Sequence, residues 1–136
     1  MPAGGASASP SSGGWYSYAA IRVVPRVDRG EFINVGVVLF ARTLHFLEAR
    51  IEVDPERLRL LAPDLHLEDV KQHLDVFRRI ASGEPGAGPI AALSQSERFH
   101  WLTSPRSTVI QTSEVHVGRC DDPHLALEDL MTKLVR

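Results

Sequence analysis

The sequence has little that would span a membrane, cross-link the chain or hold a metal. A single cysteine, Cys120, excludes an intramolecular disulfide and a zinc site with several cysteine ligands. No stretch approaches the roughly 18 uncharged apolar residues of a transmembrane helix. The first residues lack the positive start and the apolar run of a signal peptide. We therefore expect a soluble protein of the cytoplasm that makes no use of a membrane.

An excess of charge of one sign is also missing. Fifteen Lys and Arg residues against 17 Asp and Glu residues give a formal net charge of −2. This balance excludes an overall positive field for holding nucleic acid or an anionic membrane, while a local basic patch stays compatible with it. The 136 residues, 43% of them hydrophobic and 24% charged, have the size and composition of one globular domain.

The common cofactor and catalytic motifs are absent as well. The chain has no G-x-x-x-x-G-K-[ST] loop, no G-x-G-x-x-G after a strand, no G-x-S-x-G elbow and no H-E-x-x-H. His66 and His73 lie seven residues apart with Asp69 between them, a spacing that places ligands on one side of a helix. The simpler interpretation is a helix start and a solvated flank, and we expect neither a metal nor a cofactor.

The segments that are present predict an α+β fold with an antiparallel sheet. Residues 15–24, 32–40 and 46–53 are rich in β-branched and aromatic side chains, and short links join them. This pattern favours a three-stranded meander. Residues 107–111 and 114–117 predict a short C-terminal strand pair. Within the second strand we expect one face to present Ile33, Val35, Val37 and Leu39 and the other to present Asn34, Gly36, Val38 and Phe40.

Helices are expected on either side of the last strands. Residues 65–82 carry apolar side chains at steps of three and four, which predicts a long amphipathic helix that packs on the sheet. Asp54-Pro55 predicts the start of a short helix, and Asp122-Pro123 that of a C-terminal helix. We divide the chain into a disordered tail, residues 1–14, which is too poor in apolar side chains to fold, and a single α+β domain, residues 15–136.

The most site-like segment is Glu97–Ser113, which we expect to be an irregular polar loop. Its candidate site residues are His100, Trp101, Arg106, Ser107, Thr108 and Gln111. The guanidinium of Arg106 beside two hydroxyls suits a phosphate or a carboxylate. His100 beside Trp101 adds a titratable group next to an aromatic ring that can stack. The alternative is an ordinary loop rich in Ser, Thr and Pro, in which Phe99 and Trp101 only cover the core.

A second candidate lies around the start of the second strand. Asn34 and Gly36 interrupt an otherwise apolar run, which suits a fixed hydrogen bond and the close approach of a ligand or another backbone. The structural interpretation is a β-bulge or a tight contact between helix and sheet. Arg22, on the first strand, either pairs with Glu31 or Glu114 or extends a basic surface.

Two ordered stretches resemble the signatures of a bacterial family, domain of unknown function 3037 (DUF3037). The stretches are residues 30–39, preceded by Tyr18 and residues 22–25, and residues 97–102, followed by residues 105–108, Gln111 and His116. The resemblance spans residues 15–135. It implies a small, stand-alone bacterial protein without an established activity. It also implies a neighbouring gene for a kinase that resembles the persistence toxin kinases, and therefore a kinase as partner. Recurrent positions of the family fall on Glu31, Asn34, Gly36, Trp101, Arg106, Ser107 and Thr108.

Three functions are open at this point. The first, which we favour because no catalytic constellation is evident, is a non-enzymatic binding or adaptor module. The second is an enzyme that acts on a phosphate-bearing or nucleic-acid substrate through the polar segment. In that enzyme Arg22 and Arg106 would hold the anion, and His100 or His116 would act with Glu31 as acid and base. The third is nucleic-acid binding without catalysis, which the acidic balance makes a weaker hypothesis.

Overall fold

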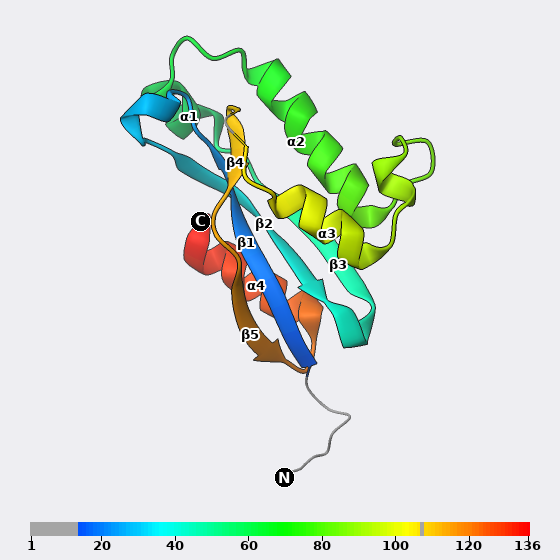
Figure 1. Ribbon diagram of the computed structural model, residues 1–136. Coiled ribbons are helices and arrows are strands. Elements are labelled where there is room, and N and C mark those ends of the chain that lie inside the picture. Colours follow the sequence, from blue (N-terminus) through cyan, green and yellow to red (C-terminus); the bar gives the residue numbers. More distant parts are fainter. Residues whose placement is uncertain (1–13, 107) are drawn as a thin grey trace.

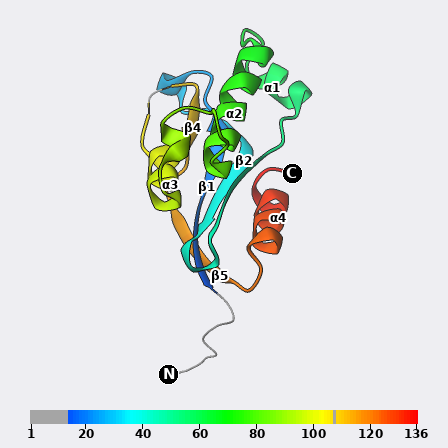
Figure 2. The same ribbon diagram turned by 90° about the vertical axis from the view of Figure 1, so that its right-hand side faces the viewer.

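A central antiparallel sheet lies between helices on both of its faces in the computed structural model, which describes residues 14–106 and 108–136 (Figures 1 and 2). The strands are β1 (Gly14–Val23), β2 (Ile33–Ala41), β3 (Phe46–Ile51), β4 (Ile110–Thr112) and β5 (His116–Cys120). The helices are α1 (Pro55–Leu61), α2 (Leu67–Ser82), α3 (Gln95–Thr103) and α4 (Pro123–Leu134), with short 3-10 turns η1 (Val27–Arg29), η2 (Arg42–Leu44) and η3 (Ile90–Ala92). Residues 1–13 of the expected tail and Ser107 lie outside the described residues. Gly14, the last residue of that expected tail, instead begins β1.

The sheet has the order β3-β2-β1-β4, and β5 also pairs with β1. The predicted α+β class and the meander of the first three strands are confirmed. Both short C-terminal strands are present, but they pair with β1 rather than with each other, so they form one interrupted edge. Ser113 bridges the interruption because its hydroxyl accepts a hydrogen bond from the Ala20 N–H at 2.9 Å, in place of a backbone carbonyl. The ten-residue β1 is thus long enough to pair with β4 and β5 along the same edge.

A β-bulge at the start of β2 changes which side chains share a face. The register of β1 and β2 shifts there, since Ile21 pairs with Gly36 and Arg22 pairs with Asn34. As a result Val35 packs with Val38 on one side of the sheet, whereas Val37 packs on the other side. The β-bulge, one of the two structural interpretations of Asn34 and Gly36, is confirmed. The expected alternation, which placed Val35 and Val37 on one face, is wrong across Gly36, because the extra residue of a bulge resets the period of two.

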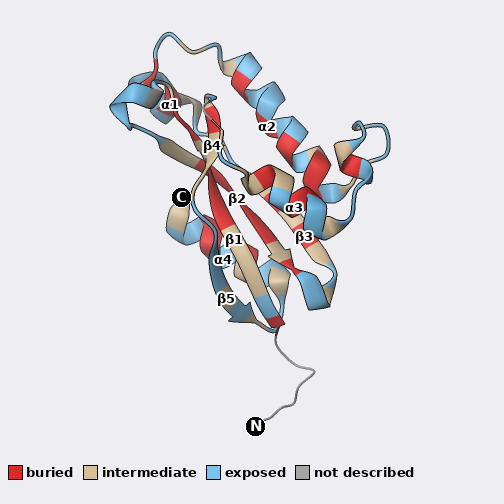
Figure 3. Cartoon of the chain, viewed as in Figure 1, coloured by how far each residue is buried: buried red, intermediate tan, exposed pale blue. Residues whose placement is uncertain are grey.

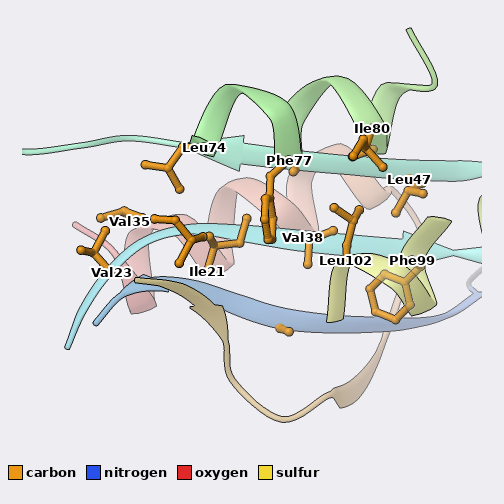
Figure 4. Packing of buried hydrophobic residues seen from close by; sticks show 14 of the residues in the cluster. Ile21, Val23, Val35, Val38, Leu47, Leu74, Phe77, Ile80, Phe99 and Leu102 are labelled. Atoms are coloured by element: carbon orange, nitrogen blue, oxygen red, sulfur yellow. The ribbon is translucent and has the colours of Figure 1, made fainter. Parts of the chain in front are cut away.

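Two clusters of buried side chains hold the layers together. Buried residues recur along β1, β2 and α2 (Figure 3). On one face, the α2 stripe of Leu74, Phe77 and Ile80 packs over the sheet beside Leu102 of α3 (Figure 4). On the other face, α4 packs Leu127, Leu130 and Met131 onto β2. The predicted packing of a long helix and a C-terminal helix on the sheet is confirmed. Among residues 14–106 and 108–136, no helix is long and apolar enough to cross a membrane.

The expected loop from residue 97 onward is wrong in its first part, which forms α3. The Ser94 hydroxyl accepts a hydrogen bond from the Glu97 N–H, and the Glu97 carboxylate accepts one from the Ser94 N–H, a complete capping box. Phe99 and Leu102 then bury the inner side of the helix. Ser94-x-x-Glu97 was the sequence signal for this helix, and the many polar residues that follow obscured it.

The bulge generates the first prediction, a loss of stability in Gly36→Ala. A Cβ at this position would lie 2.5 Å from the Arg50 carbonyl oxygen, which is backbone and cannot move aside alone. We expect the free energy of unfolding to fall by about 2 kcal/mol or more, the range of overpacked sites. Urea denaturation followed by circular dichroism measures it. Wild-type stability in this variant would contradict the described register.

Candidate functional site

A groove of about 700 Å³ opens between the first half of α2, the end of α3 and the segment that leads into β4. Its buried lining is apolar and consists of Val24, Val70, Phe77 and Ile110. Its polar side chains are Asp64, His66, Asp69 and His73 along the α2 side, and Arg106 and Thr108 on the β4 side. We call this feature the α2–β4 groove. It brings together three residues of the predicted polar site, Trp101, Arg106 and Thr108.

Arg106 forms a fixed wall of the groove rather than a free anion clamp. Its guanidinium lies 5.0 Å from the ring centre of Phe77 and 4.7 Å from that of Trp101. The terminal nitrogens donate hydrogen bonds to the carbonyls of Leu102 at 2.9 Å and Trp101 at 2.8 Å. Burial lowers the pKa of Arg106. The last carbonyls of a helix lack backbone N–H partners within it. The Arg106 side chain therefore supplies hydrogen-bond donors to carbonyls at the end of α3.

The other polar side chains of this segment also donate hydrogen bonds to backbone carbonyls. The Thr103 and Ser104 hydroxyls donate to carbonyls of the preceding turn of α3, and the Thr108 hydroxyl donates to the Ile110 carbonyl. The Gln111 amide donates to the Thr108 carbonyl. Ser107, the other predicted hydroxyl ligand, lies outside the described residues. Many of the polar side chains that suggested a site thus bond to backbone carbonyls at the end of α3 and at the start of β4.

The predicted acid and base groups lie on different elements, and Glu31 borders a neighbouring hollow that shares Asp64 and Leu65 with the groove. Glu31 is exposed in the link between β1 and β2 and pairs with Arg29 at 3.3 Å. The ring of His116 on β5 stacks on Tyr18, a residue that packs against the cluster under α4. His100 is exposed on α3 and is not among the residues that line the groove. None of these three side chains therefore lines the groove beside Arg106.

Three other predicted residues share one row on the opposite face of the sheet. Arg22 of β1 has Asn34 of β2 as its register partner on one side and Gln111 of β4 on the other. The Asn34 amide nitrogen donates to the Leu134 carbonyl at the end of α4, at 3.1 Å. The guanidinium carbon of Arg22 lies 3.9 Å from the ring centre of Phe32. Burial lowers the pKa of Arg22, and the nearby charge of Glu114 opposes this shift.

The histidines considered as metal ligands line the groove instead. His66 precedes α2 at its cap position, and His73 is exposed about two turns further along the helix. In the described part of the chain no three His, Cys, Asp or Glu side chains come together as a metal site would require. His66 and His73 are spaced to share one side of α2. This spacing was the sequence signal for the side of the helix that faces the groove.

Arg98 is a buried polar residue that the sequence interpretation missed. Only 8% of it is exposed, and its guanidinium donates to the carbonyls of Leu93, Ile80 and Ala81 at 2.7–3.0 Å. It therefore binds the end of α2 to the start of α3 and fixes the angle between two helices that border the groove. No pattern of residue types distinguishes this arginine from a solvated one.

The capping role of Arg106 generates a second prediction. Arg106→Gln removes two charge-assisted hydrogen bonds to the end of α3, and we expect the free energy of unfolding to fall by about 2 kcal/mol. Arg119 is the matched control, because it lies over Trp15 at 4.9 Å but is exposed. Arg119→Gln should change stability by less than about 0.5 kcal/mol. Equal effects in urea denaturation would refute the capping role.

The comparisons with known proteins agree with the resemblance seen in the sequence. The family described as "Protein of unknown function (DUF3037)" matches residues 18–135, which include every described helix and strand at least in part. Neither the curated proteins nor the solved structures gave a significant match. The chain belongs to the DUF3037 family.

Proposed function

We propose that this protein is a non-catalytic binding module that holds an apolar anchor of a protein partner in the α2–β4 groove. The observation that carries the proposal is the groove itself, about 700 Å³ in volume and lined by apolar side chains with a few polar groups at its edges. This size and composition are typical of binding sites in proteins. Arg106 donates hydrogen bonds to the Leu102 and Trp101 carbonyls and so fixes one wall of the groove. Because this wall is already ordered, binding costs little conformational entropy there.

The charge at the edge of the groove indicates the chemistry of the partner. Asp64 and Asp69 lie on the α2 side, next to His66 and His73. An apolar anchor flanked by lysine or arginine would bury its side chain against the lining and bring its cation to these carboxylates. The same carboxylates disfavour a phosphate backbone, which supports a protein partner over nucleic acid.

The catalytic arrangement expected from the sequence has no support at Arg106. A general acid or base must lie within hydrogen-bond reach of the reacting group, directly or through one water. Neither Glu31 nor His116 lines the groove, and both terminal nitrogens of Arg106 already bond to carbonyls. The kinase that the family resemblance implies, one resembling the persistence toxin kinases, is the first partner to test. We place both proteins in the cytoplasm.

A charge-introducing variant at the groove tests the proposal. Val76 lines the groove and is 43% exposed on α2, so Val76→Arg leaves the core intact. We expect this change to weaken binding of the purified kinase by about tenfold or more, because the new cation obstructs an apolar contact. Isothermal titration calorimetry measures the dissociation constant.

Leu60 provides the matched control. It is 86% exposed on α1 and does not line the groove. Leu60→Arg adds one positive charge, as Val76→Arg does, so the two variants have the same net charge. Leu60→Arg should change the dissociation constant for the kinase by less than about twofold. Equal affinities of both variants and the wild-type protein would reject the groove as the binding site.

A further inference from the structure

The sheet has an open edge at β5. This strand pairs with β1 and has no second partner strand among residues 14–106 and 108–136. It forms the outer edge at its end of the sheet, beyond α2 and α3 (Figure 1). The backbone N–H and C=O groups that point away from β1 can therefore pair with another strand. Many proteins protect such an edge with lysine or proline, and β5 contains neither.

The face of the sheet beside this edge carries exposed apolar side chains. The register of β1 and β5 places Trp15 opposite Arg119 and Ser17 opposite Val117, so these four side chains share one face. Trp15 is 63% exposed and Val117 is 68% exposed. The Arg119 guanidinium lies 4.9 Å from the ring centre of Trp15. An open strand edge next to an exposed apolar patch is typical of a site where a further strand pairs.

A second copy of this chain suits the edge better than the N-terminal segment of the same chain. Residues 1–13 are mostly Gly, Ala, Ser and Pro, and their one large apolar side chain is Met1. Residues of these types are depleted in strands and have little apolar surface to bury. A second β5 has the same open edge and the same apolar face, so a two-fold axis would join the two patches.

The sequence of β5 is compatible with pairing to itself in one register. An antiparallel pair centred on Gly118 uses all five residues of the strand, with Val117 opposite Arg119 and His116 opposite Cys120 of the second copy. A shift of two residues in one direction would place Arg119 opposite Arg119, which like charges disfavour. The opposite shift would leave Arg119 and Cys120 facing residues outside β5. A shift of one residue would exchange the two faces.

We propose that two copies of this protein associate through antiparallel pairing of β5 with β5, centred on Gly118, so that one sheet runs through both copies. Main-chain hydrogen bonds join the strands, and each Val117 packs against the aliphatic part of Arg119 of the second copy. Because the paired strands are short, we expect a dissociation constant on the order of micromolar. No residue of β5 lines the α2–β4 groove, so this contact does not depend on what the groove binds.

A pair of charge variants at Val117 tests the proposal by sedimentation velocity. Val117→Lys places a cation opposite Arg119 of the second copy, so the dissociation constant of the dimer should rise by about tenfold or more. Val117→Glu is the matched control, because it removes the same apolar side chain but places an anion opposite Arg119. Its dissociation constant should stay within about threefold of the wild-type value. Both variants should fold, since Val117 is largely exposed, and circular dichroism checks this.

His116→Cys tests the register by using the native Cys120. Opposite residues of antiparallel strands have Cα atoms about 4.5–5.5 Å apart, a distance that a disulfide spans. Within one chain, positions 116 and 120 of the strand are about 13 Å apart, which is too far for a disulfide. Oxidation of His116→Cys with copper phenanthroline should therefore give a covalent dimer. Leu60→Cys, on the exposed outer side of α1, should give far less covalent dimer at the same concentration.

Three results would count against the dimer or its register. A wild-type chain that stays monomeric up to about 1 mM would overturn the proposal. Equal weakening by Val117→Lys and Val117→Glu would contradict the placement of Val117 opposite Arg119. A yield of covalent dimer in His116→Cys no higher than in Leu60→Cys would contradict the register centred on Gly118. These measurements use this protein alone, so a kinase that does not bind the groove would leave them unaffected.

Discussion

Each long helix of this protein ends on carbonyls that are bonded by a side chain from outside that helix. Arg98 of α3 bonds the end of α2, Arg106 bonds the end of α3, and Asn34 of β2 and Arg57 of α1 bond the end of α4. The last carbonyls of a helix carry partial negative charge and lack partners in the helix, so each contact satisfies an acceptor and links two elements. These contacts add direction to the apolar packing that holds α2, α3 and α4 on the sheet.

The proposed binding site lies next to such a helix end. Arg106 and Trp101 border the α2–β4 groove where α3 ends. The Arg106 side chain thus both bonds the end of a helix and forms part of the groove.

The sequence predicted the parts of the fold that follow from local patterns. The stripe of α2 and the strands of the meander have clear periods, and the Asp54 and Asp122 side chains cap α1 and α4 as expected. It did not reveal α3, whose buried side includes the charged Arg98. It indicated a bulge near Asn34 and Gly36 only as one of two structural interpretations, and it placed Val35 and Val37 on one face, whereas they lie on opposite faces. It selected residues on both faces of the sheet but could not separate them, because hydrogen bonds to distant carbonyls leave no pattern in the chain.

The two tryptophans offer the most direct test of the central claim, that the α2–β4 groove is the partner-binding site. Trp101 lines the groove, whereas Trp15 is 63% exposed on β1 and does not line it. Fluorine NMR of fluorotryptophan-labelled protein therefore reports both places in one spectrum as the kinase is added. If the groove binds the kinase, we expect the chemical shift of the Trp101 fluorine to change and that of the Trp15 fluorine to stay the same. A complex that moves only the Trp15 signal, or neither signal, would contradict it.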